Sequence, residues 1–239
     1  MTKNNISLKA KDISAGYGEQ IIIRNINLDI YESSITTIIG PNGCGKSTFL
    51  KSISGIINPV EGNIEIYGKN VTNLSTFELS KIGLGYVPQS ENIFPSLTVE
   101  DNLKMGGYIL TGEQYKKNLD KVLEMFPDLK SKLQDSSSNL SGGQRQMLAL
   151  SRALMLDPKI IMLDEPTAGL SPIIVDEVLD NITSLKNSDL SVLLVEQNAK
   201  KALQISDIGV VFSFGEKVME DGADKILKDK EISKLYLGG

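Results

Sequence analysis

The stretch Gly40-Pro41-Asn42-Gly43-Cys44-Gly45-Lys46-Ser47-Thr48 decides the fold, because it follows the pattern G-x-x-x-x-G-K-S of a phosphate-binding P-loop. The β-branched run at 35–39, just before it, predicts a buried strand. The residues that follow Thr48 begin a helical pattern. A chance glycine-rich turn would not need these two neighbours, so the sequence predicts a strand, a phosphate loop and a helix in that order.

The residue types of this loop suit the phosphates of a nucleotide. Gly43 and Gly45 have no Cβ, so the backbone can turn tightly and aim successive N–H groups inward. These groups and the N-terminus of the following helix favour an anion. Lys46 adds a positive charge for the β- and γ-phosphate oxygens, and the Ser47 hydroxyl is a hard oxygen ligand suited to Mg²⁺.

Composition narrows the class of protein. The 239 residues are 41% hydrophobic and 23% charged, as in an ordinary soluble globular protein. The net charge of −5 does not favour a nucleic-acid surface. The single cysteine, Cys44, allows no intrachain disulfide, and the absence of histidine excludes histidine metal ligands and histidine-dependent triads. We expect no signal peptide, and no run of about 18 apolar residues predicts a membrane span.

Hydrophobic periodicity predicts an α/β architecture. Alternating residues at 6–13, 21–30 and 64–68 indicate antiparallel strands, and Pro88 ends a further strand at 83–89. After a helix that starts with Thr98 as its N-cap, helices are predicted at 113–126, 143–156, 172–186 and 199–205. Strands at 160–163, 192–195 and 210–214 alternate with them and imply a parallel sheet. From Gly222 the chain is a charged amphipathic stretch, typical of a solvated helix.

A second group of candidate residues follows the buried run 160–163. Asp164 and Glu165 end this strand, where α/β sheets bind ligands in a crevice. Asp164 is suited to hold Mg²⁺, and Glu165 is suited to orient the attacking water or accept its proton. An acidic pair that merely starts a helix is the alternative, but the P-loop in the same chain favours function. Gln89 ends its own strand, and its carbonyl oxygen could reach the metal.

A third motif opens a helix at Leu140-Ser141-Gly142-Gly143-Gln144. Its glycines, the Ser141 hydroxyl and the free N–H groups of the first turn make a second anion site. One nucleotide in one subunit has no obvious use for two such sites.

With these three motifs, the sequence resembles the ABC transporter ATPases over essentially its whole length. The resemblance implies a single ABC ATPase domain at 1–239: a P-loop NTPase core with an antiparallel β subdomain and an inserted helical subdomain at about 89–156. It implies ATP and Mg²⁺ as cofactors, Tyr17 stacked on adenine, Gln89 in the Q-loop, and Glu165 as the catalytic glutamate. Residues 140–144 would be the signature motif, which contacts the γ-phosphate of ATP bound to the partner subunit in a head-to-tail dimer.

Two positions depart from the family pattern. Gln197 stands where the family has its switch histidine, and it can donate a hydrogen bond to the γ-phosphate but cannot carry charge. Ser171 stands where many members have an aspartate in the D-loop, 168–171, so contacts through that carboxylate cannot be assumed.

Within the family, four segments resemble the ATPases of branched-chain amino-acid importers: 99–107, 169–172, 195–198 and the terminal Tyr236-Leu237-Gly238-Gly239. The resemblance implies a peripheral protein at the cytoplasmic face of the membrane. Its partners would be a second, different ATPase subunit, permease subunits and, indirectly, a solute-binding protein, with no nucleic acid. A homodimer remains possible in isolation. We further expect residues 90–95, with Phe94 exposed, and the following helix to contact the permease. A core position for Phe94 is the alternative.

Other interpretations stay open. Urea or amide importer ATPases share much of the same pattern. A DNA-repair or chromosome ATPase would need a long coiled coil between the P-loop and the signature, and a translation factor would need two cassettes in one chain; this sequence has neither feature, which argues against both. A nucleotide-dependent regulator that binds ATP without turnover is disfavoured by Glu165 and the signature, although Gln197 keeps it open.

Overall fold

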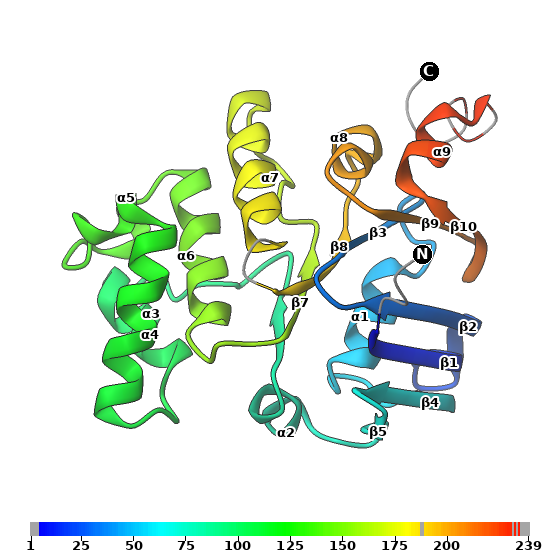
Figure 1. Cartoon of the computed structure of the whole chain (residues 1–239), viewed down its shortest axis with the longest axis horizontal. Helices are drawn as coiled ribbons and strands as arrows, with labels where there is room; N and C mark the ends of the chain where they lie inside the picture. The colour runs from blue at the N-terminus through cyan, green and yellow to red at the C-terminus, as the bar shows by residue number, and fades with distance from the viewer. Residues whose placement is uncertain (1–4, 187–188, 231, 233, 235–239) are drawn as a thin grey trace.

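Two β-sheets organise the structure, and they differ in the direction of their strands (Figure 1). The computed structural model describes residues 5–186, 189–230, 232 and 234. The first sheet is antiparallel, with the order β2-β1-β4-β5, which confirms the predicted β subdomain. Its strands are β1 (Ile6–Tyr17), β2 (Gln20–Tyr31), β4 (Glu61–Ile66) and β5 (Lys69–Asn70).

The second sheet is the predicted parallel sheet with one antiparallel edge, in the order β10-β9-β3-β8-β7-β6. Its strands are β3 (Ile35–Ile39), β6 (Leu84–Val87), β7 (Ile160–Asp164), β8 (Ser191–Val195), β9 (Ile208–Ser213) and β10 (Glu216–Gly222). Every residue of β3, β7 and β8 is buried, as continuous apolar runs predict. The sequence analysis did not predict β10, because its many charged residues, which suit an exposed edge, hide the strand pattern.

The helices follow the predicted positions closely. They are α1 (Lys46–Ile53), α2 (Thr76–Lys81), α3 (Val99–Gly106), α4 (Gly112–Met125), α5 (Pro127–Lys130), α6 (Gly142–Leu154), α7 (Pro172–Lys186), α8 (Ala199–Gln204) and α9 (Ala223–Lys228), with a 3₁₀ turn at Ser137–Asn139. The Thr98 hydroxyl caps α3 by accepting from the amide of Asp101 at 3.0 Å, as predicted. The sequence analysis missed α2, although the capping box of Ser75 and Glu78 marks its start. It also missed α5, because it predicts Pro127 only as the end of the preceding helix, whereas Pro127 is the first residue of this one.

Helix α1 lies between the two sheets, so the P-loop that precedes it is held by both. Phe49, Leu50 and Ile53 of α1 are buried in one core with apolar residues of both sheets. The Phe49 ring packs edge-on against Phe212 of β9, with centroids 5.5 Å apart. Helices α3, α4, α6 and α7 share a second core with the other face of the parallel sheet, and they gather on the side away from the antiparallel sheet (Figure 1).

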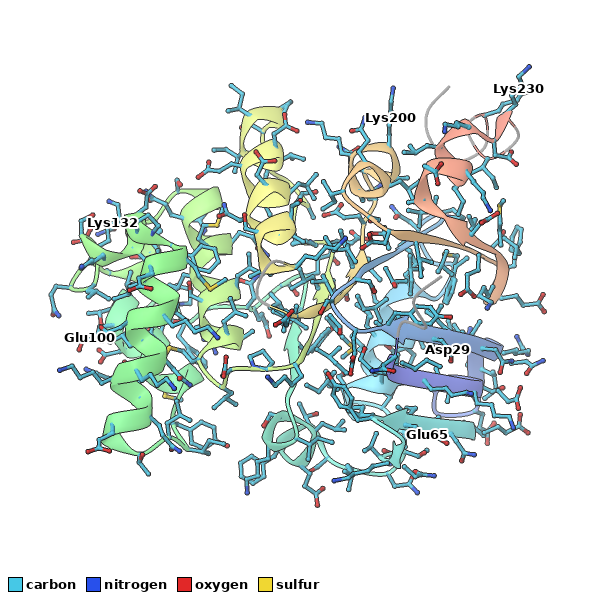
Figure 2. The ribbon with its side chains drawn as sticks, viewed as in Figure 1. Asp29, Glu65, Glu100, Lys132, Lys200 and Lys230 are labelled. Atoms are coloured by element: carbon cyan, nitrogen blue, oxygen red, sulfur yellow. The ribbon has the colours of Figure 1, made fainter. Side chains whose placement is uncertain are left out.

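Charged side chains of both signs are spread over the molecule. Figure 2 labels examples on the antiparallel sheet, on α3, in the turn after α5, on α8 and after α9, namely Asp29, Glu65, Glu100, Lys132, Lys200 and Lys230. None of the helices in the part of the chain that the structure describes is both long and apolar enough to cross a bilayer. The terminal segment 236–239, on which part of the resemblance rests, lies outside the described residues.

Candidate functional site

The loop between β3 and α1 needs glycine because its backbone is packed tightly. Gly40 and Gly45 have φ angles of 152° and 104°. A Cβ on Gly40 would lie 2.2 Å from the carbonyl oxygen of Phe212, and one on Gly45 would lie 2.3 Å from a methyl carbon of Ile23. At Gly43, with φ of 79°, a Cβ would meet no atom within 4 Å. The loop therefore packs against β9 at Gly40 and against β2 at Gly45, and it is open at Gly43.

Lys46 is held at the mouth of this loop. Its side chain is 4% exposed, and Nζ donates to the carbonyls of Gly40 at 2.9 Å and Pro41 at 3.2 Å. The same Nζ lies 3.9 Å from a carboxylate oxygen of Glu165. A buried ammonium is thus placed beside the open loop, where it can meet an anion.

Ser47 and Asp164 form the next part of the site. The Ser47 hydroxyl donates to Asp164 Oδ1 at 2.9 Å, and the Tyr86 hydroxyl donates to Oδ2 at 3.4 Å. Burial raises the pKa of Asp164, and the hydrogen bond from Ser47 partly opposes this rise. Burial and the charge of Asp164 also raise the pKa of Tyr86, so its hydroxyl remains a donor. The sequence analysis did not identify Tyr86. Its position on β6, beside β7, brings it to Asp164.

Glu165 sits in a left-handed backbone conformation, with φ of 47°. Its amide donates to the carbonyl of Val195 in β8 at 2.9 Å, which fixes the turn after β7 to the neighbouring strand. Its carboxylate accepts from Gln89 Nε2 at 2.9 Å. Burial raises the pKa of Glu165, whereas the nearby charge of Lys46 lowers it. The carboxylate is therefore held between a cation and an amide at the edge of the open loop.

These side chains surround a cleft of about 500 Å³. Its lining consists of Tyr17, Ile22, Asn42, Gly43, Gly45, Lys46, Ser47, Thr48, Gln89, Glu165 and Gln197. Asp164 is joined to this group through Ser47, while Gly40 and Pro41 hold Lys46 from behind. Cys44 is buried and does not line the cleft, and burial raises the pKa of its thiol. Ile22, which the sequence analysis did not select, adds an apolar wall near Tyr17.

The residues Ser141 to Gln144 lie apart from this cleft, at the start of α6. The Ser141 hydroxyl accepts from the Gln144 amide at 3.2 Å, and Gln144 Oε1 accepts from the Ser141 amide at 3.1 Å. A Cβ on Gly142 or Gly143 would lie 2.9 Å from Leu170 and 2.7 Å from Ile174, respectively. The glycines thus let α6 pack closely on the start of α7. Within one chain, the residues of the predicted P-loop site lie together around the cleft, whereas the second predicted anion site lies outside that cleft.

The donor set of the cleft fits Mg²⁺. Ser47 and Asp164 offer hard oxygen atoms close to each other, and the carbonyl oxygen of Gln89 lines the same cleft. No group of three or more His, Cys, Asp or Glu that would suit a metal occurs among the described residues. Mg²⁺ with a nucleotide takes only one or two carboxylates from the protein and fills its other positions with phosphate and water.

Comparison with known proteins agrees with this geometry. The family model described as ABC transporter matches residues 23–168. A relative from Archaeoglobus fulgidus, described as a probable branched-chain amino acid transport ATP-binding protein LivF, is 40% identical over 97% of this chain and 98% of its own length.

Solved structures show the same fold. An ATP-binding cassette of an ABC transporter in its ADP conformation superposes with a TM-score of 0.88, at 27% identity, over 98% of this chain and 100% of that one. A dimeric ATP-binding cassette in a post-hydrolysis state, bound to ADP and Pi, gives a TM-score of 0.78 at 29% identity, over 90% of this chain and 98% of that one. The chain therefore belongs to the ABC transporter family, as an ATP-hydrolysing subunit.

Proposed function

We propose that this chain powers the import of branched-chain amino acids by hydrolysing ATP at the cleft around its P-loop. One observation carries the catalytic part: the Glu165 carboxylate lies between Lys46 and Gln89, next to the linked pair Ser47 and Asp164. The proposed identity of the solute is supported by the similarity of nearly the whole chain to the LivF protein.

Several side chains in and beside the cleft have distinct parts in the proposed mechanism. The P-loop amides and Lys46 bind the β- and γ-phosphates, and Tyr17 stacks on the adenine. Ser47, Asp164 and Gln89 would hold Mg²⁺, which when bound neutralises phosphate charge. Glu165 orients the attacking water and accepts its proton, which suits a carboxylate whose pKa is raised by burial. Gln197 donates a hydrogen bond to the γ-phosphate.

A partner subunit completes the site in this proposal. Residues 141–144 lie at the start of α6, outside the cleft of their own chain. The capping box uses the N–H groups of Ser141 and Gln144, so those of Gly142 and Gly143 would meet the γ-phosphate bound by another subunit. ATP-binding cassettes of this family form dimers, as the post-hydrolysis structure does. We infer that the natural partner is a second, different ATPase subunit, with a homodimer possible in isolation.

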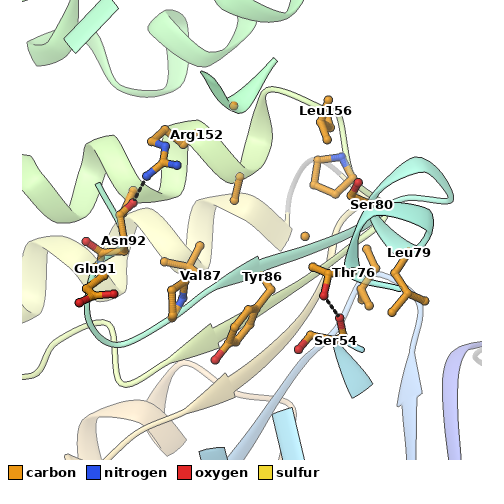
Figure 3. Close-up of a pocket in the computed structure, with 17 residues that line it drawn as sticks. Ser54, Thr76, Leu79, Ser80, Tyr86, Val87, Glu91, Asn92, Arg152 and Leu156 are labelled. Atoms are coloured by element: carbon orange, nitrogen blue, oxygen red, sulfur yellow. Dashed lines mark hydrogen bonds between the residues drawn. The ribbon is translucent and has the colours of Figure 1, made fainter. Parts of the chain in front are cut away.

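A groove lined by residues of α2, β6 and α6 is the proposed docking site of the permease (Figure 3). It has a volume of about 260 Å³ and lies between α2, β6 and α6. Arg152 of α6 lines it, donates to the carbonyl of Asn92 and lies 4.5 Å from the centroid of Phe94, which is 40% exposed. Among the described residues no carboxylate forms an ion pair with Arg152, which leaves its charge free for a partner. Docking of the permease here would hold the chain at the cytoplasmic face of the membrane.

The direct test is ATP hydrolysis by the transporter assembled in lipid, with its permease, its second ATPase subunit and either a leucine-loaded or a urea-loaded binding protein. We expect stimulation by the leucine-loaded protein. Stimulation by urea alone would keep the mechanism and replace the solute. ATP binding without stimulation by any assembly would favour a nucleotide-dependent regulator.

The role of Glu165 is tested in the same assembly. We expect Glu165→Gln to lower the hydrolysis rate by roughly 10²-fold or more while ATP still binds, because an amide cannot accept the proton of water. Glu113→Gln, on the exposed side of α4, is the control for loss of one negative charge. An unchanged steady-state rate for Glu165→Gln would show that this role is wrong.

A further inference from the structure

Glu196 is a buried carboxylate that lies behind the cleft and not in its lining. It follows β8 directly and is 2% exposed. Its Oε1 accepts from the amide of Thr167 at 2.9 Å, and its Oε2 accepts from the amides of Gln197 at 3.1 Å and Asn198 at 3.4 Å. Among the described residues it forms no ion pair, so hydrogen-bond donors compensate its charge.

These hydrogen bonds, and one from the Thr167 side chain that lowers the pKa of Glu196 against the effect of burial, join two loops that carry different parts of the site. Thr167 comes two residues after Glu165, and Gln197 comes directly after Glu196. The two loops are also tied at their bases, where the Glu165 amide donates to the carbonyl of Val195. Glu196 therefore bridges the segment after β7 and the segment after β8 from within the protein, while Glu165 and Gln197 face the cleft.

The chemistry of the bridge requires a carboxylate. Three N–H donors meet two oxygen atoms, and a carboxylate has enough lone pairs to accept all three. A glutamine would turn an NH₂ group toward at least one of these donors and leave it unsatisfied. An aspartate would keep the charge but would be shorter by one carbon–carbon bond, about 1.5 Å.

We propose that Glu196 is a positioning residue for ATP hydrolysis, which fixes Gln197 relative to Glu165 across the γ-phosphate. Because Gln197 carries no charge, its hydrogen bond to the phosphate depends on placement alone, and Glu196 supplies that placement. The proposal rests on the roles proposed above for Glu165 and Gln197.

The first test compares Glu196→Gln, Glu196→Asp and the control Glu113→Gln in the assembled transporter. We expect Glu196→Gln to lower kcat about tenfold or more, while the Kd for ATP measured by equilibrium binding changes less than about twofold. Glu196→Asp should lose less of kcat. Equal losses of kcat and ATP affinity, or an unchanged kcat, would overturn the proposal. If Glu196→Gln does not fold, Glu196→Asp is measured alone, and an unchanged kcat has the same meaning.

The second test separates positioning from a general structural effect. In a Gln197→Ala background, single-turnover hydrolysis should fall no further when Glu196→Gln is added, because Glu196 acts through a group already lost. A further fall of the same factor would show that Glu196 does not act through Gln197. Failure of the proposed role of Glu165 would be seen separately, as an unchanged rate in the Glu165→Gln single variant.

Discussion

At the scale of residues, the cleft is built around carboxylates held partly out of water. Asp164, Glu165 and Glu196 each have a pKa raised by burial, and hydrogen-bond donors or Lys46 oppose the rise. Glu165 also has a left-handed backbone, which is uncommon for a residue other than glycine, and its amide bond to Val195 holds it there. The proposed site of hydrolysis thus combines partly desolvated carboxylates with one residue in a left-handed conformation.

The raised pKa of Glu165 predicts a pH dependence of stability. The folded protein keeps this proton to higher pH than the unfolded chain does, so the stabilisation from this carboxyl is fully present below the unfolded pKa and is lost as pH rises through the folded pKa. We expect Glu165→Gln to remove this loss. From about pH 4 upward, the free energy of unfolding of the native protein should therefore decrease relative to that of the variant.

The measurement is chemical denaturation across this pH range without nucleotide or metal. Glu113→Gln serves as the surface control. Parallel curves for the native protein and Glu165→Gln would contradict the expectation.

At the scale of elements, close contact between α3 and α6 depends on one glycine. A Cβ on Gly106, at the end of α3, would lie 2.5 Å from the carbonyl oxygen of Arg152 and 3.0 Å from its Cα. These are backbone atoms of α6 and cannot move aside without shifting a helix. The second predicted anion site, residues 141–144, lies at the start of α6. A shift of α6 relative to α3 would therefore also move this site.

We expect Gly106→Ala to lower the free energy of unfolding by about 1–3 kcal/mol, since it overpacks a helix contact. Gly112→Ala is the matched control. It also lies in a helix, α4, but its Cβ would meet nothing within 4 Å, so we expect a change between zero and a gain of about 1 kcal/mol. Denaturant titration measures the free energy of unfolding of both variants. Equal effects of the two substitutions would show that the contact with α6 does not require glycine at position 106.

At the scale of the whole molecule, the groove at Arg152 connects the proposed permease site to the proposed site of hydrolysis. Arg152 holds the Asn92 carbonyl in the segment that follows Gln89, and Gln89 in turn donates to Glu165. Burial lowers the pKa of Arg152 without removing its charge, so a partner that presents a carboxylate would find an ion-pair partner here.

We therefore expect Arg152→Ala to reduce the permease-stimulated ATPase rate by roughly tenfold, the effect of losing a charged hydrogen bond, and to leave the unstimulated rate of the isolated subunit within about twofold. Arg152→Lys should retain part of the stimulation, and Lys121→Ala, in an exposed pair with Asp157, is the control. Full stimulation of Arg152→Ala, or crosslinks that place the permease away from Asn92 and Phe94, would exclude this groove as the docking site.

The sequence by itself determined the elements and the main members of the site, because both depend on local pattern. The apolar run 160–163 predicted β7, and the helix predicted at 172–186 has the bounds of α7. The P-loop, Asp164, Glu165 and Gln89 were chosen from spacing and from strand ends, and they converge on one cleft or touch its lining.

Only the tertiary structure decided which residues support that site from outside the motifs. Tyr86 reaches Asp164 because β6 and β7 are neighbours, Glu196 joins two loops through backbone amides, and Arg152 meets Asn92 across 60 residues of chain. None of these contacts has a local sequence signal, since each depends on segments brought together by the sheet and by the packing of α6. The charged strand β10 has the same explanation: its partner β9, and not its own periodicity, makes it a strand.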